Sequence, residues 1–232
     1  MGIEEMHVTF RELAQQMGMQ TVRAILPENI DICLNAVIID TVKELIAITV
    51  GSLPYNDKVA RQNAAISPIN GLRTLYKKDF IQEEDIKGDG TEVSPYNINI
   101  NSNNIMLYIG FKVSYNDSTL YDCRIIENED LGQTLRDFCN RAAKDSPICT
   151  ITGDTQQIQV DIFTGTKNMV KPKLIQYLYI KEPAKVYYDE DNTDNNVDCD
   201  LPQYLHMDIV KRAVSIYLQS IGGIRDTNKN ND

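Results

Sequence analysis

The 232-residue sequence has no tryptophan and only two histidines, His7 and His206. Its five cysteines include no Cys-x-x-Cys pair, which excludes the zinc-ribbon and thioredoxin-like classes. The glycine-rich phosphate loops and the Gly-x-Ser-x-Gly elbow of hydrolases are also missing. With two histidines, a serine or cysteine nucleophile has few ways to find a base. We therefore expect a protein that is not an enzyme and that carries no cofactor.

Basic residues are scarce: 23 Lys and Arg stand against 33 Asp and Glu, for a net charge of −10. Proteins that grip nucleic acid usually have a basic face, so this balance argues against that role. No apolar run reaches the ~18 residues that could span a bilayer. The start, MGIEEMHVTF, lacks the regions of a secretory signal, and Met6 stands where a myristoylation motif has Ser or Thr. We expect a chain made in the cytoplasm, with free thiols and no membrane partner.

The N-terminal part is predicted to be helical. Thr9 and Glu12 have the spacing of a capping box, and the helix that they begin would end near Gly18. A second helix is expected from Pro27 to Val50. It has two apolar stripes where a surface helix needs one, so it should make contacts on two sides. The first stripe is Ile30, Leu34, Val37, Ile38, Leu45 and Ile48, and the second is Ile32, Ile39, Val42 and Ile46.

Residues 51–95 are mixed in character. Short helical pieces are expected at Lys58–Ala65 and Leu72–Lys78, interrupted by prolines and Gly71. The segment Asp79–Glu92 is acidic and contains the turn signal Gly88-Asp89-Gly90, so we interpret it as an exposed loop.

The middle of the chain has the period-2 pattern of half-buried strands. A hairpin is predicted from Leu107–Tyr115 and Leu120–Ile126, followed by a helix at Glu129–Lys144 with Phe138 inward. The remaining predicted strands are Ile148–Thr152, Gln156–Phe163, Lys173–Lys181 and Lys185–Tyr188. The fold class is therefore α+β, with helices from both chain ends packed with a mainly antiparallel β-sheet.

A final helix follows the acidic segment Asp189–Asp200. Asp200 is its expected N-cap, Gly222-Gly223 its stop, and Ile224–Asp232 a flexible tail. We expect a single chain with a helical part at 9–80, a β-rich part at 93–188 and the C-terminal helix at 200–223.

Two patterns leave alternatives open. Asp194, Asn196, Asp198 and Asp200 alternate as in a calcium loop, but Cys199 and Leu205 stand where glycine and glutamate are needed. A solvated acidic linker is therefore favoured, and we predict no metal site. Tyrosines lie near lysines, a composition that can stack nucleic-acid bases, although tyrosines on strands more often serve cores and interfaces. They are Tyr177, Tyr179, Tyr187 and Tyr188, close to Lys173, Lys181 and Lys185.

The two ends of the sequence resemble one known family. FRELAQQMGMQTVRAILPENIDICLNAVIIDTV near the start, with IQYLYIKEPAKVYY and LPQYLHMDIVKRAVSIYLQSIGG near the end, is similar to the head-to-tail connector proteins of crAss-like tailed bacteriophages. The strand end Tyr-Ile-Lys-x-Pro followed by Leu-Pro-x-x-Leu-His is the most specific part. This resemblance implies a virion protein that forms a ring, commonly of twelve copies. The ring would lie beneath the portal, contact the portal and the next tail ring or hub, and enclose the genome channel.

A ring interface needs two different complementary faces on each copy. Our candidates for packing or ring contact are Val37, Val42, Ile209, Val214 and Tyr217. An acidic channel wall would let double-stranded DNA pass without binding it. Channel-facing candidates are Glu83, Glu84, Asp85, Asp189 and Asp191. The alternative is a cytoplasmic, non-enzymatic binding or regulatory module, with calcium dependence through Asp189–Asp200.

Overall fold

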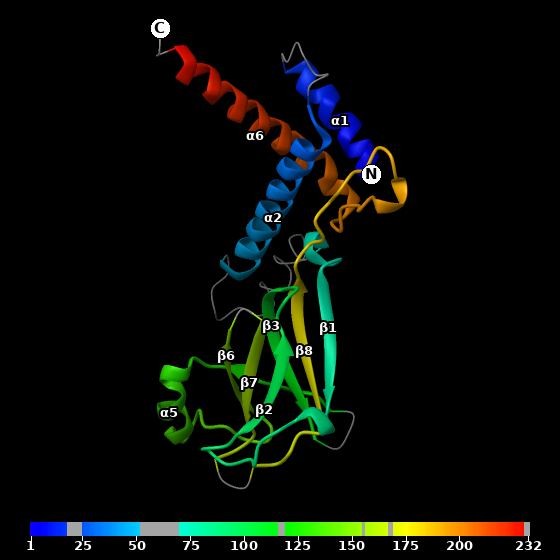
Figure 1. Cartoon of the computed structure of the whole chain (residues 1–232). Coiled ribbons are helices and arrows are strands. Elements are labelled where there is room, and N and C mark those ends of the chain that lie inside the picture. Colours follow the sequence, from blue (N-terminus) through cyan, green and yellow to red (C-terminus); the bar gives the residue numbers. More distant parts are fainter. Residues whose placement is uncertain (18–24, 52–69, 116–118, 155, 167–168, 230–232) are drawn as a thin grey trace. The chain divides into compact units, whose positions relative to one another are not determined.

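The computed structural model describes residues 1–17, 25–51, 70–115, 119–154, 156–166 and 169–229, with backbone alone for 49–51 and 222–229. The chain divides into two compact units (Figure 1). The helical unit comprises Met1–Leu75 and Pro183–Asp232, and the β unit comprises Tyr76–Glu182. The expected α+β class is confirmed. The end helices pack on one another in a unit of their own, and the β-rich part begins at Tyr76 and not at 93.

The first helix, α1 (Ile3–Gln16), begins seven residues before the predicted start, since its N-cap is Gly2 and not Thr9. Ile3, Met6, His7, Phe10 and Ala14 recur at helical spacing and are all buried, which carries the helix upstream of Thr9. Thr9 lies inside the helix, where its hydroxyl donates to the carbonyl of Glu5. The predicted capping box is therefore wrong, and the segment before Thr9 is part of the packed helix.

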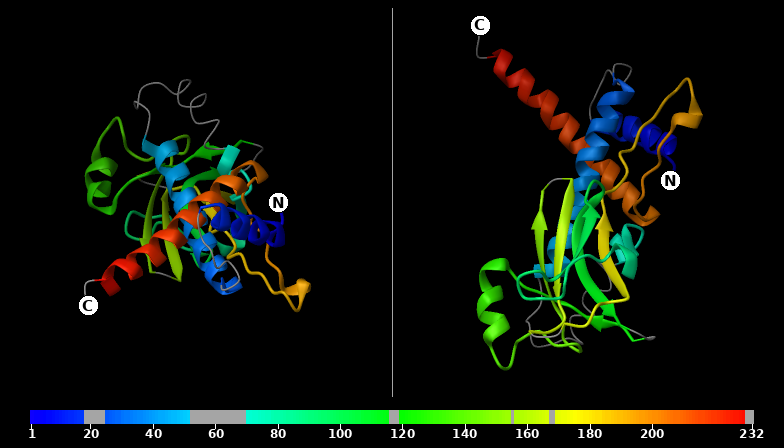
Figure 2. Two further views of the ribbon diagram at one scale, coloured as in Figure 1. Left: turned by 90° about the horizontal axis from the view of Figure 1, so that it is seen from above. Right: turned by 60° about the horizontal axis from the view of Figure 1, so that its bottom comes forward.

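The core of the helical unit forms where α1 meets α2 (Pro27–Gly51) and α6 (Gln203–Lys229). The helices α2 and α6 cross in all views (Figures 1 and 2). The ring of Phe10 packs edge-on against Tyr217, with 5.8 Å between ring centroids. The side chains without exposed surface include Met6, Phe10 and Ala14 on α1, Ile30, Leu34 and Val42 on α2, and Val210, Ala213 and Val214 on α6.

The second helix has the predicted extent, but the last helix does not. It begins at Gln203 and continues through Gly222-Gly223 to Lys229, so the predicted stop is wrong. A glycine costs about 1 kcal/mol in a helix interior, which weakens a helix without forbidding it. Residues 224–229 of the predicted flexible tail are thus helical, and 230–232 lie outside the described residues.

A segment without regular helix, Pro183–Pro202, connects the β unit to α6; we call it the strap. It contains the short 3-10 helix η3 (Thr193–Asn195) and one antiparallel bridge between Tyr187 and Val197. The predicted strand Lys185–Tyr188 is not formed. Val186 is instead buried in the helical unit.

The β unit contains two four-stranded sheets that share one hydrophobic core. The first sheet has the order β1 (Tyr76–Gln82), β8 (Leu174–Lys181), β3 (Ile105–Ser114), β4 (Tyr121–Asp122). The second has the order β2 (Tyr96–Asn101), β7 (Gln157–Phe163), β6 (Ile148–Gly153), β5 (Arg124–Ile125). All pairings are antiparallel except β5 with β6.

Several local predictions change in this unit. The predicted hairpin partner Leu120–Ile126 divides between the sheets, since β4 pairs with β3 while β5 pairs with β6. The helix expected at Leu72–Lys78 gives way to β1 from Tyr76 onward. The helix α5 (Asn128–Arg136) is shorter than predicted, and Phe138 beyond it is 81% exposed.

The acidic segment Asp79–Glu92 is a loop only in part. It begins within β1, continues as the 3-10 helix η2 (Glu83–Asp85) and turns at Gly88 and Gly90, whose φ angles are +102° and +68°. The predicted piece Lys58–Ala65 and the turn at 116–118 lie outside the described residues. No helix among the described residues combines the length and apolarity that crossing a bilayer requires.

Candidate functional site

A buried polar cluster joins the strap to the first two helices. Nε2 of His7 lies 2.8 Å from Oδ1 of Asp31, and the other carboxylate oxygen accepts the backbone N–H of Tyr188 at 3.2 Å. The Tyr188 ring packs on His7 with 4.5 Å between centroids. One carboxylate on α2 therefore holds both α1 and the strap.

His7 is 1% exposed, and its Nδ1 atom has no hydrogen-bond partner within the described structure. Burial lowers the pKa of His7, while the bond and the charge of Asp31 oppose that shift. A base must reach the proton that it removes. His7 is shielded from solvent and bonded to Asp31. The pair therefore fits a structural role, in which it holds α1 on α2, better than that of a catalytic dyad.

Asn35 binds the strap as a neighbouring strand would. Its Nδ2 donates to the carbonyl of Val186 at 3.0 Å, and its Oδ1 accepts the N–H of the same residue at 2.8 Å. Both backbone groups of Val186 therefore have hydrogen-bond partners, as buried polar groups require, since Val186 itself is only 2% exposed.

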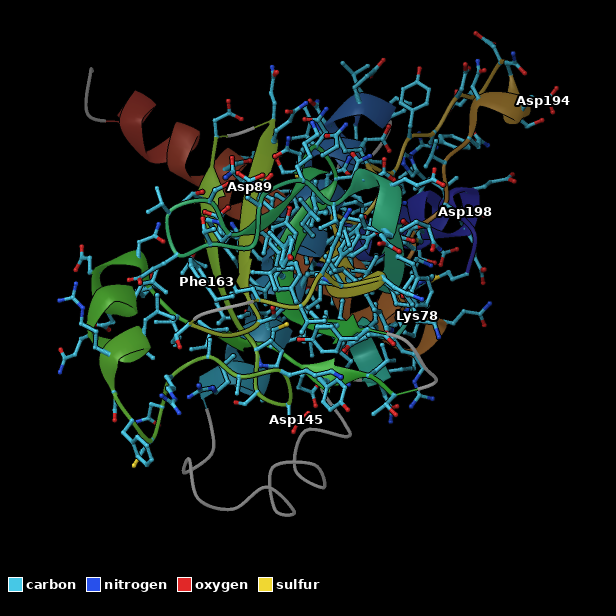
Figure 3. All side chains as sticks on the ribbon, turned by 90° about the horizontal axis from the view of Figure 1, so that it is seen from below. Lys78, Asp89, Asp145, Phe163, Asp194 and Asp198 are labelled. Carbon is cyan, nitrogen blue, oxygen red and sulfur yellow. The ribbon has the colours of Figure 1, made fainter. Side chains whose placement is uncertain are left out.

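The alternating acidic pattern of the strap also has a structural use. The side chains of Asn196, Asp198 and Asp200 accept backbone N–H groups from Asp189, Ile3 and Ala184, at 2.8, 2.7 and 3.1 Å. Figure 3 shows Asp198 beside α1, whereas Asp194 lies on η3, where the strap turns back. The described residues contain no group of three or more His, Cys, Asp or Glu able to hold a metal ion. The calcium-loop alternative thus has no ligand cluster there to support it.

The described histidines and cysteines do not form a pair of nucleophile and general base. Both ring nitrogens of His206 lie against backbone carbonyls, 3.0 Å from Met1 O and 2.7 Å from Leu201 O. The five cysteines are free thiols. Contact with Cys149, together with burial, raises the pKa of Cys123, and burial raises those of Cys33 and Cys199. The raised pKa favours the protonated, less nucleophilic form of the thiol at Cys33, Cys123 and Cys199.

Four of the five predicted interface residues are buried in the core of the helical unit. Val37, Val42, Ile209 and Val214 are 0–2% exposed, so they pack within the chain and are not accessible to a second copy. Of the two roles predicted for them, these four residues therefore have that of packing and not that of ring contact, because they lie in the core that α1, α2 and α6 form with one another. Tyr217 is half-buried against Phe10.

The predicted channel residues occur in different units. Glu83, Glu84 and Asp85 are exposed on η2 in the β unit, and Asp191 is exposed on the strap. Asp189 organises the strap, because its carboxylate accepts from the Asn195 side chain and from the N–H groups of Asp191 and Asn192. These bonds, with that of Asn195 the largest, lower the pKa of Asp189.

The tyrosines of β8 also contact neighbours within the chain. Tyr177 and Tyr179 stack with 5.5 Å between ring centroids, and the Tyr179 hydroxyl donates to Asp79 at 2.8 Å. Burial and this bond raise the pKa of Tyr179 to about 12. Their neighbour is a carboxylate, which does not favour a nucleic-acid backbone.

The outer side of α2 is a surface that the predicted second stripe identified in part. Ile32 is 66% exposed, and one helical turn apart along the same side lie exposed or half-buried small and apolar residues. We call these residues, together with Lys43 on the same side, the outer stripe: Ile32, Ala36, Ile39, Lys43, Ile46 and Ala47. The predicted second stripe contains three of these residues, whereas its fourth, Val42, belongs to the core.

The helix α6 provides a second exposed surface. Tyr204 is 62% exposed and Met207 is 43% exposed near its start. Between α2 and α6 runs an open groove of about 290 Å³. Arg212 on α6 binds Glu44 on α2 across it at 2.8 Å, and Ile216 lies at its edge. The helical unit thus exposes apolar side chains on two different helices.

No protein-family model matches this sequence, and a comparison with curated proteins finds no significant match.

Proposed function

We propose that this chain is a structural protein that assembles into a ring of a phage head-to-tail connector, between the portal and the next tail component. The observation that carries the proposal is the exposure of large apolar side chains on both α2 and α6 of one unit. Exposed apolar patches often mark interaction sites. A ring contact requires two distinct surfaces on each copy, and these two helices supply them.

The sequence resemblance gives the kind of assembly. The similar segments correspond to α1 and α2 at the start and to β8, the strap and α6 at the end. Except for β8, these elements make up the helical unit, in which α2 and α6 expose large apolar side chains. The chain also has exposed carboxylates on η2 and the strap, which repel phosphate and would let DNA pass.

A reconstruction of the phage particle tests the proposal. The expected result is density for this chain as a ring around the tail axis, beneath the portal. Protein that is abundant in infected cells but absent from purified particles would contradict it.

A calcium titration separates this role from the calcium-dependent alternative. Because Asn196, Asp198 and Asp200 accept backbone N–H groups, millimolar calcium should leave the melting temperature unchanged. A rise of several degrees that a chelator reverses would favour the regulatory module instead.

A further inference from the structure

The outer stripe of α2 combines apolar residues with two charged residues that form no ion pair within the described part of the chain. Lys43 lies within it, and Asp40 lies three residues earlier along its edge. Neither residue has an ion-pair partner among the residues that the structure describes. A helix face with an acid and a base three residues apart presents both charges to the same neighbour.

The outer face of α6 has the same two charges in the same order along the chain, an acid followed three residues later by a base. Asp208 and Lys211 are exposed and three residues apart, and within the described part of the chain neither has an ion-pair partner. Tyr204 begins this face, and Ser215 and Leu218 continue it at helical spacing, both half-buried.

These two faces match in an antiparallel alignment. With Lys43 opposite Asp208, a step of three residues along each helix brings Asp40 opposite Lys211. One further turn brings Ala36 opposite Ser215, so two small side chains allow the helices to approach closely. Ile32 then meets the segment around Leu218, and Ala47 at the other end meets Tyr204. The matched length, from residue 32 to residue 47, is about 22 Å.

We propose that the outer stripe of α2 docks antiparallel on the outer face of α6 of a second copy, with ion pairs Lys43–Asp208 and Asp40–Lys211. The contact is heterologous, because each copy uses α2 on one side and α6 on the other, and such contacts close into rings or extend as filaments. The inference rests on the proposed function, for which it names the contact between ring subunits.

Charge reversal tests the register in the full-length chain. Lys43→Glu and Asp208→Lys each place like charges opposite one another, and each should weaken association about ten-fold in sedimentation velocity over a concentration series. The double variant K43E/D208K restores opposite charges in every contact, so its association should return to within about three-fold of the wild type. Lys78→Glu on β1 makes the same charge change at an exposed residue that belongs to neither face, and it should have no effect.

Cross-linking tests the geometry independently of affinity. Ala36→Cys with Ser215→Cys in a Cys139→Ser background should give intermolecular disulfides under mild oxidation, as a ladder that extends beyond the dimer. A ladder that stops at the dimer would indicate an isologous contact and overturn the proposal. So would single reversals without effect, a double variant that fails to recover, or a chain that neither associates nor cross-links.

The two proposals fail in different ways. A ring in the particle whose subunit contacts ignore residues 43 and 208 would overturn this register and leave the connector role in place. Charge-dependent assembly of a protein that is absent from particles would do the reverse.

Discussion

His7 shows how a single buried residue makes stability depend on pH. Burial lowers its pKa in the folded chain, and its unpaired Nδ1 has no acceptor for an added proton. The unfolded chain therefore binds a proton at higher pH than the folded chain does, near the ordinary pKa of 6.5. This contribution to stability is complete above that value and is lost as the pH falls below it, towards the lowered pKa.

We expect the free energy of unfolding of the wild type to exceed that of His7→Gln by an amount that shrinks between pH 7.5 and pH 5. Urea denaturation at several pH values measures both chains, and titrating groups that do not contact His7 contribute equally to each. A difference that stays constant over this range would show that the protonation of His7 is not coupled to folding.

Asn35 allows a second test at this scale. Replacing it with alanine leaves the N–H and C=O groups of Val186 without their partners in a buried position. Asn35→Ala should lower the free energy of unfolding by about 1–3 kcal/mol. Asn29→Ala on the exposed side of the same helix is the matched control, expected within about 0.5 kcal/mol. Equal effects of the two substitutions in thermal or urea unfolding would contradict this role.

These residues also show what the sequence could not reveal. His7 and Asp31 are 24 positions apart, and no local pattern relates them. The alternation of Asn196, Asp198 and Asp200 was visible, but a row of carbonyl and carboxylate oxygens suits backbone N–H groups as well as a cation. Only the fold, which brings Ile3 and Ala184 to these side chains, distinguishes the two uses.

At the scale of elements, helices and strands with a clear periodicity were predictable. The helix α2 and the strands β3, β6, β7 and β8 lie within a few residues of their predicted bounds. In β7 the alternating residues Ile158, Val160 and Ile162 share one face of the strand and are buried. The strand β2 was missed although its YNININ pattern alternates, so period 2 could have found it. The strand β1 has no such signal, because nearly all of its side chains are exposed at a sheet edge.

The glycines of the β unit differ in whether the fold has room for a side chain at their position. A Cβ added to Gly88, where φ is +102°, would lie 2.0 Å from the carbonyl oxygen of Pro95, whereas one added to Gly132 within α5 meets nothing within 4 Å. Gly88→Ala should destabilise the protein by more than about 2 kcal/mol, since both strain and collision act. Gly132→Ala should stabilise it by about 0.5–1 kcal/mol through helix propensity. Melting temperatures that move in the same direction would contradict this contrast.

For the whole molecule, the chain enters and leaves the β unit at neighbouring positions. Tyr76, its first residue, pairs with Ile180 near its end in the antiparallel contact of β1 with β8. The two chain segments outside it make the helical unit, whose core contains residues from both. The β unit is thus inserted into the helical unit. For this reason the linear division expected from the sequence, with separate N-terminal and C-terminal helical parts, does not describe the fold.

An inserted unit with adjacent ends and its own core should fold by itself. The core cluster of the β unit draws on both sheets and on Leu135 of α5, all within Tyr76–Glu182. We expect the isolated fragment Tyr76–Glu182 to show a β-type circular dichroism spectrum and one cooperative thermal transition. A second chain, in which a short Gly/Ser linker replaces 76–182, should retain helical signal, and Asn35→Ala should destabilise it as it does the full protein. A fragment that binds hydrophobic dyes and melts without cooperativity would show that the β unit needs the helical unit to fold.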